Sequence, residues 1–189
     1  MPYDTIVEPD CKVELFHIDA GLRDEMRRFI RERIIHNLEA TKRLLELGED
    51  YKDISAGIYT YAVEEYGKIR FLDKLNATPE KNNKLRVRYT HSNNGFLDHN
   101  HKFNLALDDK DLPESCKWLT QDFDMQDFDP RDFYMGLIAN FEARMTIFYA
   151  NFDKNNNYNS ILKPPEVDYG RLVKAVDNFL DFIRAKNYP

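Results

Sequence analysis

Two segments with a helical period place an ionisable side chain where that period requires an apolar one. In 58–72 the inward positions step by four, three, four and three residues, and Glu65 is the third of them. In 96–106 they step by three, four and three, and His99 is the second. Glu64 lies about 100° from Glu65 around the helix, so we expect it to be wetter. A buried carboxylate needs a partner, so we expect Glu65 and His99 to meet, where a histidine can act as an acid or a base.

Three cations accompany this pair. Lys68 follows Glu65 by three residues, Lys102 follows His99 by three residues, and Arg144 borders the apolar stripe of a later segment. The cluster has two interpretations. It is either a buried ion network that serves the fold alone, or a net-positive pocket that binds a phosphate or a nucleobase.

Five segments with a period of about 3.6 residues must position these groups, and they predict helices over 18–47, 52–75, 95–107, 130–148 and 166–185. The first two form a hairpin, because Gly48 ends the first helix. Gly67 has no side chain and lets another element approach the second helix closely. The polar segment 80–94 is expected to be a loop or a short extended stretch. The predicted fold class is all-α: one domain over 1–189, a bundle of about five helices with a core from about 18 to 186.

The composition suits a globular chain with a core and excludes several classes of protein. Of 189 residues, 42% are hydrophobic and 32% are charged, and Gly 7 and Pro 8 are too few for a fibrous or disordered chain. No apolar run reaches the roughly 20 residues of a membrane helix, so we expect no membrane and a cytoplasmic location. Cys11 and Cys116 are two lone thiols, which excludes a disulfide framework and a zinc knuckle.

The charge balance bears on nucleic-acid binding. A net charge of −6 argues against a protein that coats nucleic acid with its whole surface. A local basic cluster is nevertheless present, and it comprises Lys81, Lys84, Arg86 and Arg88. Any contact with RNA is therefore expected to be local.

Three blocks of the sequence resemble the AbiV family of abortive-infection proteins. The stretch 61–75 contains Glu-Glu-x-Gly-Lys, 96–103 contains His-x-x-Lys, and 144–153 runs from arginine through tyrosine and is followed by Pro164. They occur in the family's order over about 20–183. AbiV proteins are placed in the HEPN superfamily of helical bundles from bacterial defence and toxin systems, many of which are metal-independent ribonucleases that act as dimers. The resemblance thus implies a HEPN-like fold and antiviral phage resistance.

The resemblance also implies roles for individual residues. Active HEPN ribonucleases carry an arginine and, four to six residues later, a histidine, whereas here Arg144 is followed after four residues by Tyr149. His99 would then be the acid or base, with Arg144 and Lys102 holding the scissile phosphate. Glu65 would orient His99, and Lys68 would balance the charge. The residues of the site implied in this way are Arg144, His99, Lys102, Glu65, Lys68 and Tyr149.

Several functions stay open at this point. The chain is either a defence ribonuclease that arrests growth on phage infection, or a non-catalytic HEPN module that binds a nucleotide or a phage or translation protein. Arg31 and His36 have the family's spacing but lie about 140° apart on a helix. A di-iron bundle needs Glu-x-x-His on two helices, a requirement that the chain does not meet, so we expect no metal and no cofactor. The expected partners are a second copy of the chain, RNA, and a phage-encoded protein or an antitoxin.

Overall fold

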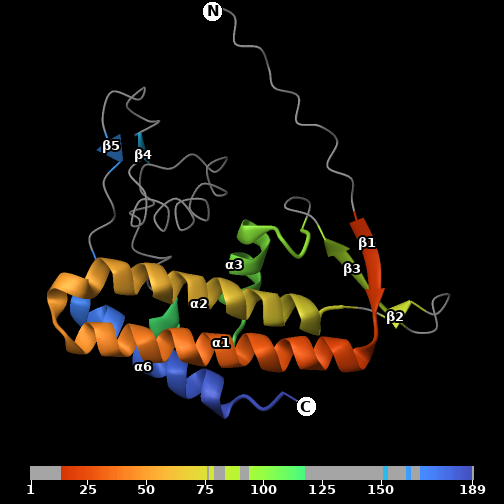
Figure 1. Cartoon of the computed structure of the whole chain (residues 1–189), viewed down its shortest axis with the longest axis horizontal. Coiled ribbons are helices and arrows are strands. Elements are labelled where there is room, and N and C mark those ends of the chain that lie inside the picture. Colours follow the sequence, from red (N-terminus) through yellow and green to blue (C-terminus); the bar gives the residue numbers. More distant parts are fainter. Residues whose placement is uncertain are drawn as a thin grey trace, which may run out of the picture.

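The computed structural model describes residues 14–75, 77–78, 84–89, 94–117, 151–152, 161–162 and 167–188. Four α-helices lie within these residues: α1 (Ala20–Glu46), α2 (Lys52–Asp73), α3 (His99–Leu107) and α6 (Tyr169–Ala185). Helices α1 and α2 run side by side in opposite directions, α6 packs against α1, and α3 packs against α2 (Figure 1). The described part of the chain is therefore mostly helical, as the periodicity predicts.

Local signals set the bounds of the hairpin. The side chain of Asp19 accepts a hydrogen bond from the backbone N–H of Leu22 at 2.7 Å and caps the start of α1. Gly48 has φ +127°, a conformation that other residues rarely adopt, and it reverses the chain into the 3₁₀ turn Glu49–Tyr51. The predicted helix 18–47 is thus confirmed except at its start, where the chain up to Ile18 belongs to a strand.

Aspartate caps also define the two shorter helices. Asp98 accepts from the N–H of His101 and Asp168 accepts from the N–H of Arg171, so α3 and α6 begin three to four residues later than predicted. The core fills the space between the helices. Tyr59 and Tyr66 are fully buried in α2 and meet the ring of Phe179 from α6 edge-on. The buried residues of α1 are Ile30, Ile34, Leu38, Thr41 and Leu45.

A three-stranded antiparallel sheet lies where α1 begins and α2 ends (Figure 1). Its strands are β1 (Glu14–Ile18), β2 (Ala77–Thr78) and β3 (Lys84–Tyr89), in the order β1-β3-β2. The segment 80–94, predicted as a loop or a short extended stretch, therefore contains an extended strand. Leu85 and Val87 are its buried residues, which ties the sheet to the core. A separate pair of short strands joins β4 (Asn151–Phe152) to β5 (Ile161–Leu162).

Several predictions lie outside the described residues. The predicted helix 130–148 and two residues implied for the site, Arg144 and Tyr149, are among them. After α3 the described residues contain a 3₁₀ turn at Glu114–Cys116, and the backbone carbonyl of Cys116 accepts a hydrogen bond from the Tyr59 hydroxyl at 2.8 Å. No helix in the described part of the chain is long and apolar enough to cross a membrane.

Candidate functional site

The site is built where α2 and α3 touch. A Cβ placed on Gly67 would lie 2.9 Å from the Cα of Lys102 and closer still to its carbonyl, so only glycine permits this approach of the two backbones. The predicted close approach at Gly67 is confirmed, and the approaching element is α3. Polar side chains one turn away on each helix are thereby brought within reach of one another.

Glu64 is the centre of the cluster. Its side chain is 2% exposed, and Oε1 accepts a hydrogen bond from Nζ of Lys102 at 2.9 Å. The same oxygen lies 2.7 Å from Nδ1 of His99. The side chain of Lys102 is also 2% exposed, whereas that of His99 is 39% exposed. A buried ion pair therefore reaches the surface through a histidine.

Glu65 belongs to a neighbouring pair. It accepts a hydrogen bond from Lys68, whose side chain is 21% exposed while that of Glu65 is 2% exposed. Burial and the nearby charge of Glu65 raise the pKa of the Tyr61 hydroxyl. That hydroxyl accepts a hydrogen bond of 3.1 Å from Arg33 on α1. The two adjacent glutamates of α2 thus serve two separate pairs.

The expected pairing of Glu65 with His99 is wrong, as is the expectation that Glu64 is wetter. His99 contacts Glu64, and both glutamates are buried. The reason is that α2 is packed against α1, α3 and α6, so that all six residues 62–67 are buried. A single inward stripe describes a helix packed on one side, and α2 has more than one inward side.

The charges of the described cluster balance. Glu64 and Glu65 face Lys68 and Lys102, and protonation of His99 would add one positive charge. The predicted excess of positive charge rests on Arg144, which is outside the described residues. Burial lowers the pKa of Lys102, and the charge of Lys68 lowers it further, against the opposing effect of Glu64. Lys102 consequently gives up its proton more readily than an exposed lysine.

This arrangement can orient a proton-transfer group. A carboxylate on Nδ1 fixes the ring and the tautomer of a histidine, so proton exchange with a bound ligand would fall to Nε2 of His99. Lys102 holds the carboxylate from the buried side. The resemblance implies that Lys102 holds the scissile phosphate, and the structure places its Nζ on the buried carboxylate of Glu64. The residue that the sequence reasoning missed is Glu64, the partner of His99, whereas Lys102 was expected in the cluster and lies beside Glu64.

No metal site forms in the described ranges. Among these residues no group of three or more histidine, cysteine, aspartate or glutamate side chains could hold a metal ion. The Arg31 and His36 pair is not assembled into a site either. Arg31 donates to the backbone carbonyls of Ile183 at 3.0 Å and Arg184 at 2.8 Å, where it caps the end of α6, and His36 is exposed.

A second polar cluster, which the sequence reasoning did not identify, joins α1, α2 and the segment after α3. The hydroxyl of Tyr66 donates to Asp109, which is 5% exposed. Nε of Arg70 lies 3.4 Å from Asp109, outside hydrogen-bond geometry, and Asp73 accepts from Arg70 at 3.2 Å. Nη2 of Arg27 lies 2.9 Å from Asp73. Paired charges of both signs make this cluster a structural network.

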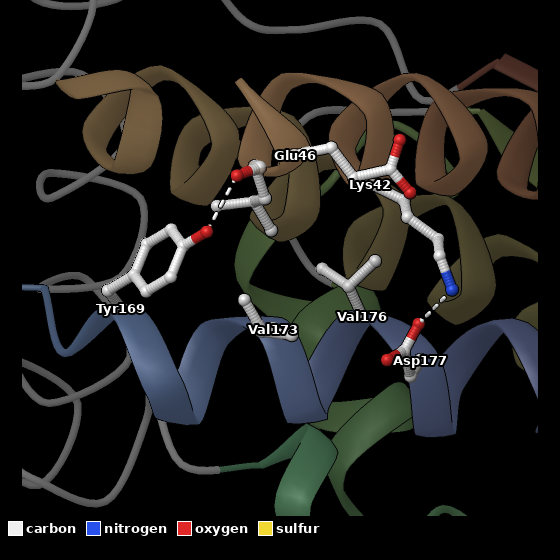
Figure 2. Close-up of a pocket in the computed structure, with 7 residues that line it drawn as sticks. Lys42, Glu46, Tyr169, Val173, Val176 and Asp177 are labelled. Atoms are coloured by element: carbon white, nitrogen blue, oxygen red, sulfur yellow. Dashed lines mark hydrogen bonds and ion pairs between the residues drawn. The ribbon is translucent and has the colours of Figure 1, made fainter. Parts of the chain in front are cut away.

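A groove of about 220 Å³ lies between α1 and α6 (Figure 2). None of its lining residues belongs to the Glu64 cluster. Leu45, Val173 and Val176 are its apolar residues. An ion pair of 2.7 Å between Lys42 and Asp177 bounds one end, as Figure 2 shows. At the other end the hydroxyl of Tyr169 donates to the carbonyl of Leu45 at 2.6 Å. The side chains of Lys42, Asp177 and Tyr169 are therefore engaged within the fold, and Glu46 also lines the groove.

Comparisons with known proteins complete the description of the site. A scan of protein-family models, a search of curated proteins and a search of solved structures each find no match to this chain. The functional conclusion therefore rests on the geometry of the cluster and on the sequence blocks that form it.

Proposed function

We propose that this chain is a bacterial anti-phage abortive-infection protein of the HEPN type, a five-helix bundle that cleaves RNA without a metal ion and so arrests growth. The observation that carries the proposal is the contact of His99 with the buried carboxylate of Glu64, itself held by Lys102. The first two AbiV-like blocks supply all three of these residues. Two motifs 35 residues apart thus converge on one histidine that reaches solvent.

In this proposal each side chain of the site has a separate role in the cleavage of RNA. His99 takes the proton of the RNA 2′-hydroxyl or returns one to the leaving oxygen. Glu64 is a positioning residue that fixes the ring of His99, in place of Glu65, and Lys102 neutralises Glu64. Arg144 stabilises the charge that develops on the phosphate. Tyr149 stands where the family has its usual histidine, so His99 supplies the function that Tyr149 lacks.

The experiment is cleavage of total cellular RNA by the purified protein in EDTA. His99→Gln and Arg144→Ala are expected to lower the rate by at least about 100-fold, the lower end for loss of an acid–base group. His36→Gln is the matched control, because it removes an exposed histidine from α1 and should leave the rate unchanged. Glu64→Gln separates positioning from structure, since it should alter the pH profile of cleavage as well as its rate. An inactive but folded wild-type protein, or full activity in His99→Gln, contradicts the ribonuclease proposal.

A second candidate is a non-catalytic HEPN module that binds a nucleotide or a phage or translation protein at the same cluster. The net charge of −6 favours it, because a nuclease for long RNA commonly has a broad basic surface. Calorimetry with nucleoside monophosphates on wild type and His99→Gln tests it. Heat of binding that disappears in the variant, without any RNA cleavage, would favour the module over the enzyme.

The proposal includes a homodimer, as in many HEPN proteins. Apolar side chains at the turn of the hairpin are exposed, namely Leu47 (68%), Tyr51 (41%) and Ile54 (45%), and Phe29 of α1 is 59% exposed. Such groups are compatible with a contact between two copies. Sedimentation of the wild type and of Leu47→Ser at tens of micromolar tests the dimer, and a monomeric wild type would contradict it.

A further inference from the structure

Strand β3 presents a row of cations on one face of the sheet. Its residues alternate, with Leu85 and Val87 buried and Lys84, Arg86 and Arg88 exposed. Alternate residues of a strand point to the same face, so these three cations project together at a spacing of roughly 6.8 Å. The face that they share is opposite to the one that packs into the core.

Strand β1 adds to this face. In the antiparallel register His17 is the direct partner of Arg86, and direct partners lie on the same face. Within the described residues, Lys84 and Arg86 form no ion pair, whereas many other cations of the described helices are paired with carboxylates. The ion pairs of the described residues therefore do not account for the positive charges of Lys84 and Arg86.

We propose that the exposed face of β3, formed by Lys84, Arg86 and Arg88 with His17 beside them, binds the phosphate backbone of RNA. The choice of RNA rests on the proposed function. The argument is charge complementarity, because the row is a local positive surface on a chain with a net charge of −6. Arginine presents a planar fork of donors that matches phosphate oxygens, and two of the three cations are arginines.

The end of the row is fixed by contacts with the segment that precedes α3. The backbone carbonyl of Arg88 accepts a hydrogen bond from the N–H of Phe96 at 2.8 Å, and Phe96 lies three residues before His99. The ring of Tyr89, which by alternation belongs to the opposite face of β3 with Leu85 and Val87, is stacked on Phe96 at 6.0 Å between centroids. The end of β3 is therefore attached to the segment that carries the proposed acid–base group.

The salt dependence of RNA binding tests this proposal. Each phosphate contact on a single strand contributes about −0.7 to the slope of log K against log salt, so three contacts contribute about −2. The contribution of these three cations to RNA affinity should therefore fall about 20-fold between 50 and 200 mM salt. We expect fluorescence anisotropy with labelled oligouridine to give that slope for the wild type.

The decisive comparison uses two triple variants with the same change of charge. K84Q/R86Q/R88Q removes the row, and R28Q/R43Q/K174Q removes one lysine and two arginines from exposed positions of α1 and α6. The first variant is expected to bind on the order of 50-fold more weakly at 0.15 M salt, with a slope shallower by about 2, and the control less than about threefold more weakly. Arg86→Gln alone, expected to bind about fourfold more weakly, covers the case in which the triple variant unfolds.

The outcomes separate this inference from the proposed function. Equal binding by the two triple variants overturns the inference, even if His99-dependent cleavage is found. Salt-dependent binding through β3 without any cleavage upholds the inference while the ribonuclease proposal fails. Binding of the wild type to vesicles containing phosphatidylserine but not to oligouridine assigns the row to an anionic membrane and overturns the RNA assignment.

Discussion

The buried pair of Glu64 and Lys102 offers a direct test of the site. Nζ of Lys102 lies 2.9 Å from Glu64, and each side chain is 2% exposed. Lys102→Met keeps the length of the side chain but removes the buried cation beside Glu64. Removal of one partner from a buried pair costs about 3–5 kcal/mol, and since His99 remains we expect about 3 kcal/mol. For a chain of this size that corresponds to a melting temperature lower by roughly 6–12 °C.

A double-mutant cycle isolates the interaction. Glu64→Gln is expected to cost about as much as Lys102→Met, because it leaves a buried cation. The double variant has no charge at either position, so its loss should be smaller than the sum of the single losses by about 2–3 kcal/mol. Urea unfolding monitored by circular dichroism gives all four free energies.

An exposed pair provides the control. Lys42 and Asp177 are 47% and 44% exposed and lie 2.7 Å apart, and a cycle of Lys42→Met with Asp177→Asn should give a coupling below about 1 kcal/mol. A Glu64–Lys102 coupling no larger than that of this control would refute the reasoning, because it would mean that water reaches the pair.

The same pair has a pH dependence of known sign. Since burial lowers the pKa of Lys102 in the folded chain below 10.5, the unfolded chain binds more protons between the two values. The free energy of unfolding of the wild type should therefore rise, relative to Lys102→Met, as the pH increases through the lowered pKa toward 10.5. A difference that falls over this range would contradict the assigned cause.

Three further predictions follow from individual contacts. Gly67→Ala should destabilise the folded chain by about 1–3 kcal/mol, because the added Cβ would overlap the backbone of α3. Gly170→Ala should leave the stability unchanged, because the nearest atom to its Cβ would lie at 3.5 Å. Urea unfolding of the two variants compares them. Burial raises the pKa of Asp109, but the hydrogen bond from Tyr66 and nearby cations bring it below 3.8. Tyr66→Phe should therefore lower the free energy of unfolding by about 1–3 kcal/mol near neutral pH, and by less once the pH falls through that lowered pKa. Urea unfolding at the two pH values measures both losses. Burial raises the pKa of Cys116 to about 11, so its alkylation by iodoacetamide, followed by mass spectrometry, should require unfolding.

The helical segments were predictable because their signals are local. The apolar period, Gly48 and the turn after it define α1 and α2 to within a few residues of the predicted bounds. Asp98 and Asp168 shortened α3 and α6 from their predicted starts, because a side-chain cap stops the helix where the period alone would extend it. The polar character of positions 65 and 99 in an apolar stripe was enough to locate the region of the candidate site.

The partners within that site were decided by tertiary packing. Glu64 is buried because three helices surround α2, and no period within α2 reports how many neighbours it has. Lys102 is buried because Gly67 lets its backbone lie against α2.

The pairing of the strands in the sheet was also decided by tertiary packing. Strand β3 shows alternation along its own length, but its pairing with β1 joins residues 14–18 to 85–89, about 70 positions apart. The sequence by itself determined the long helices, the apolar stripes and the identity of the ionisable groups, because these depend on neighbours within about one or two turns. Only the tertiary structure decided which charges meet and which cations stay exposed, because burial and pairing depend on elements that are distant in the chain.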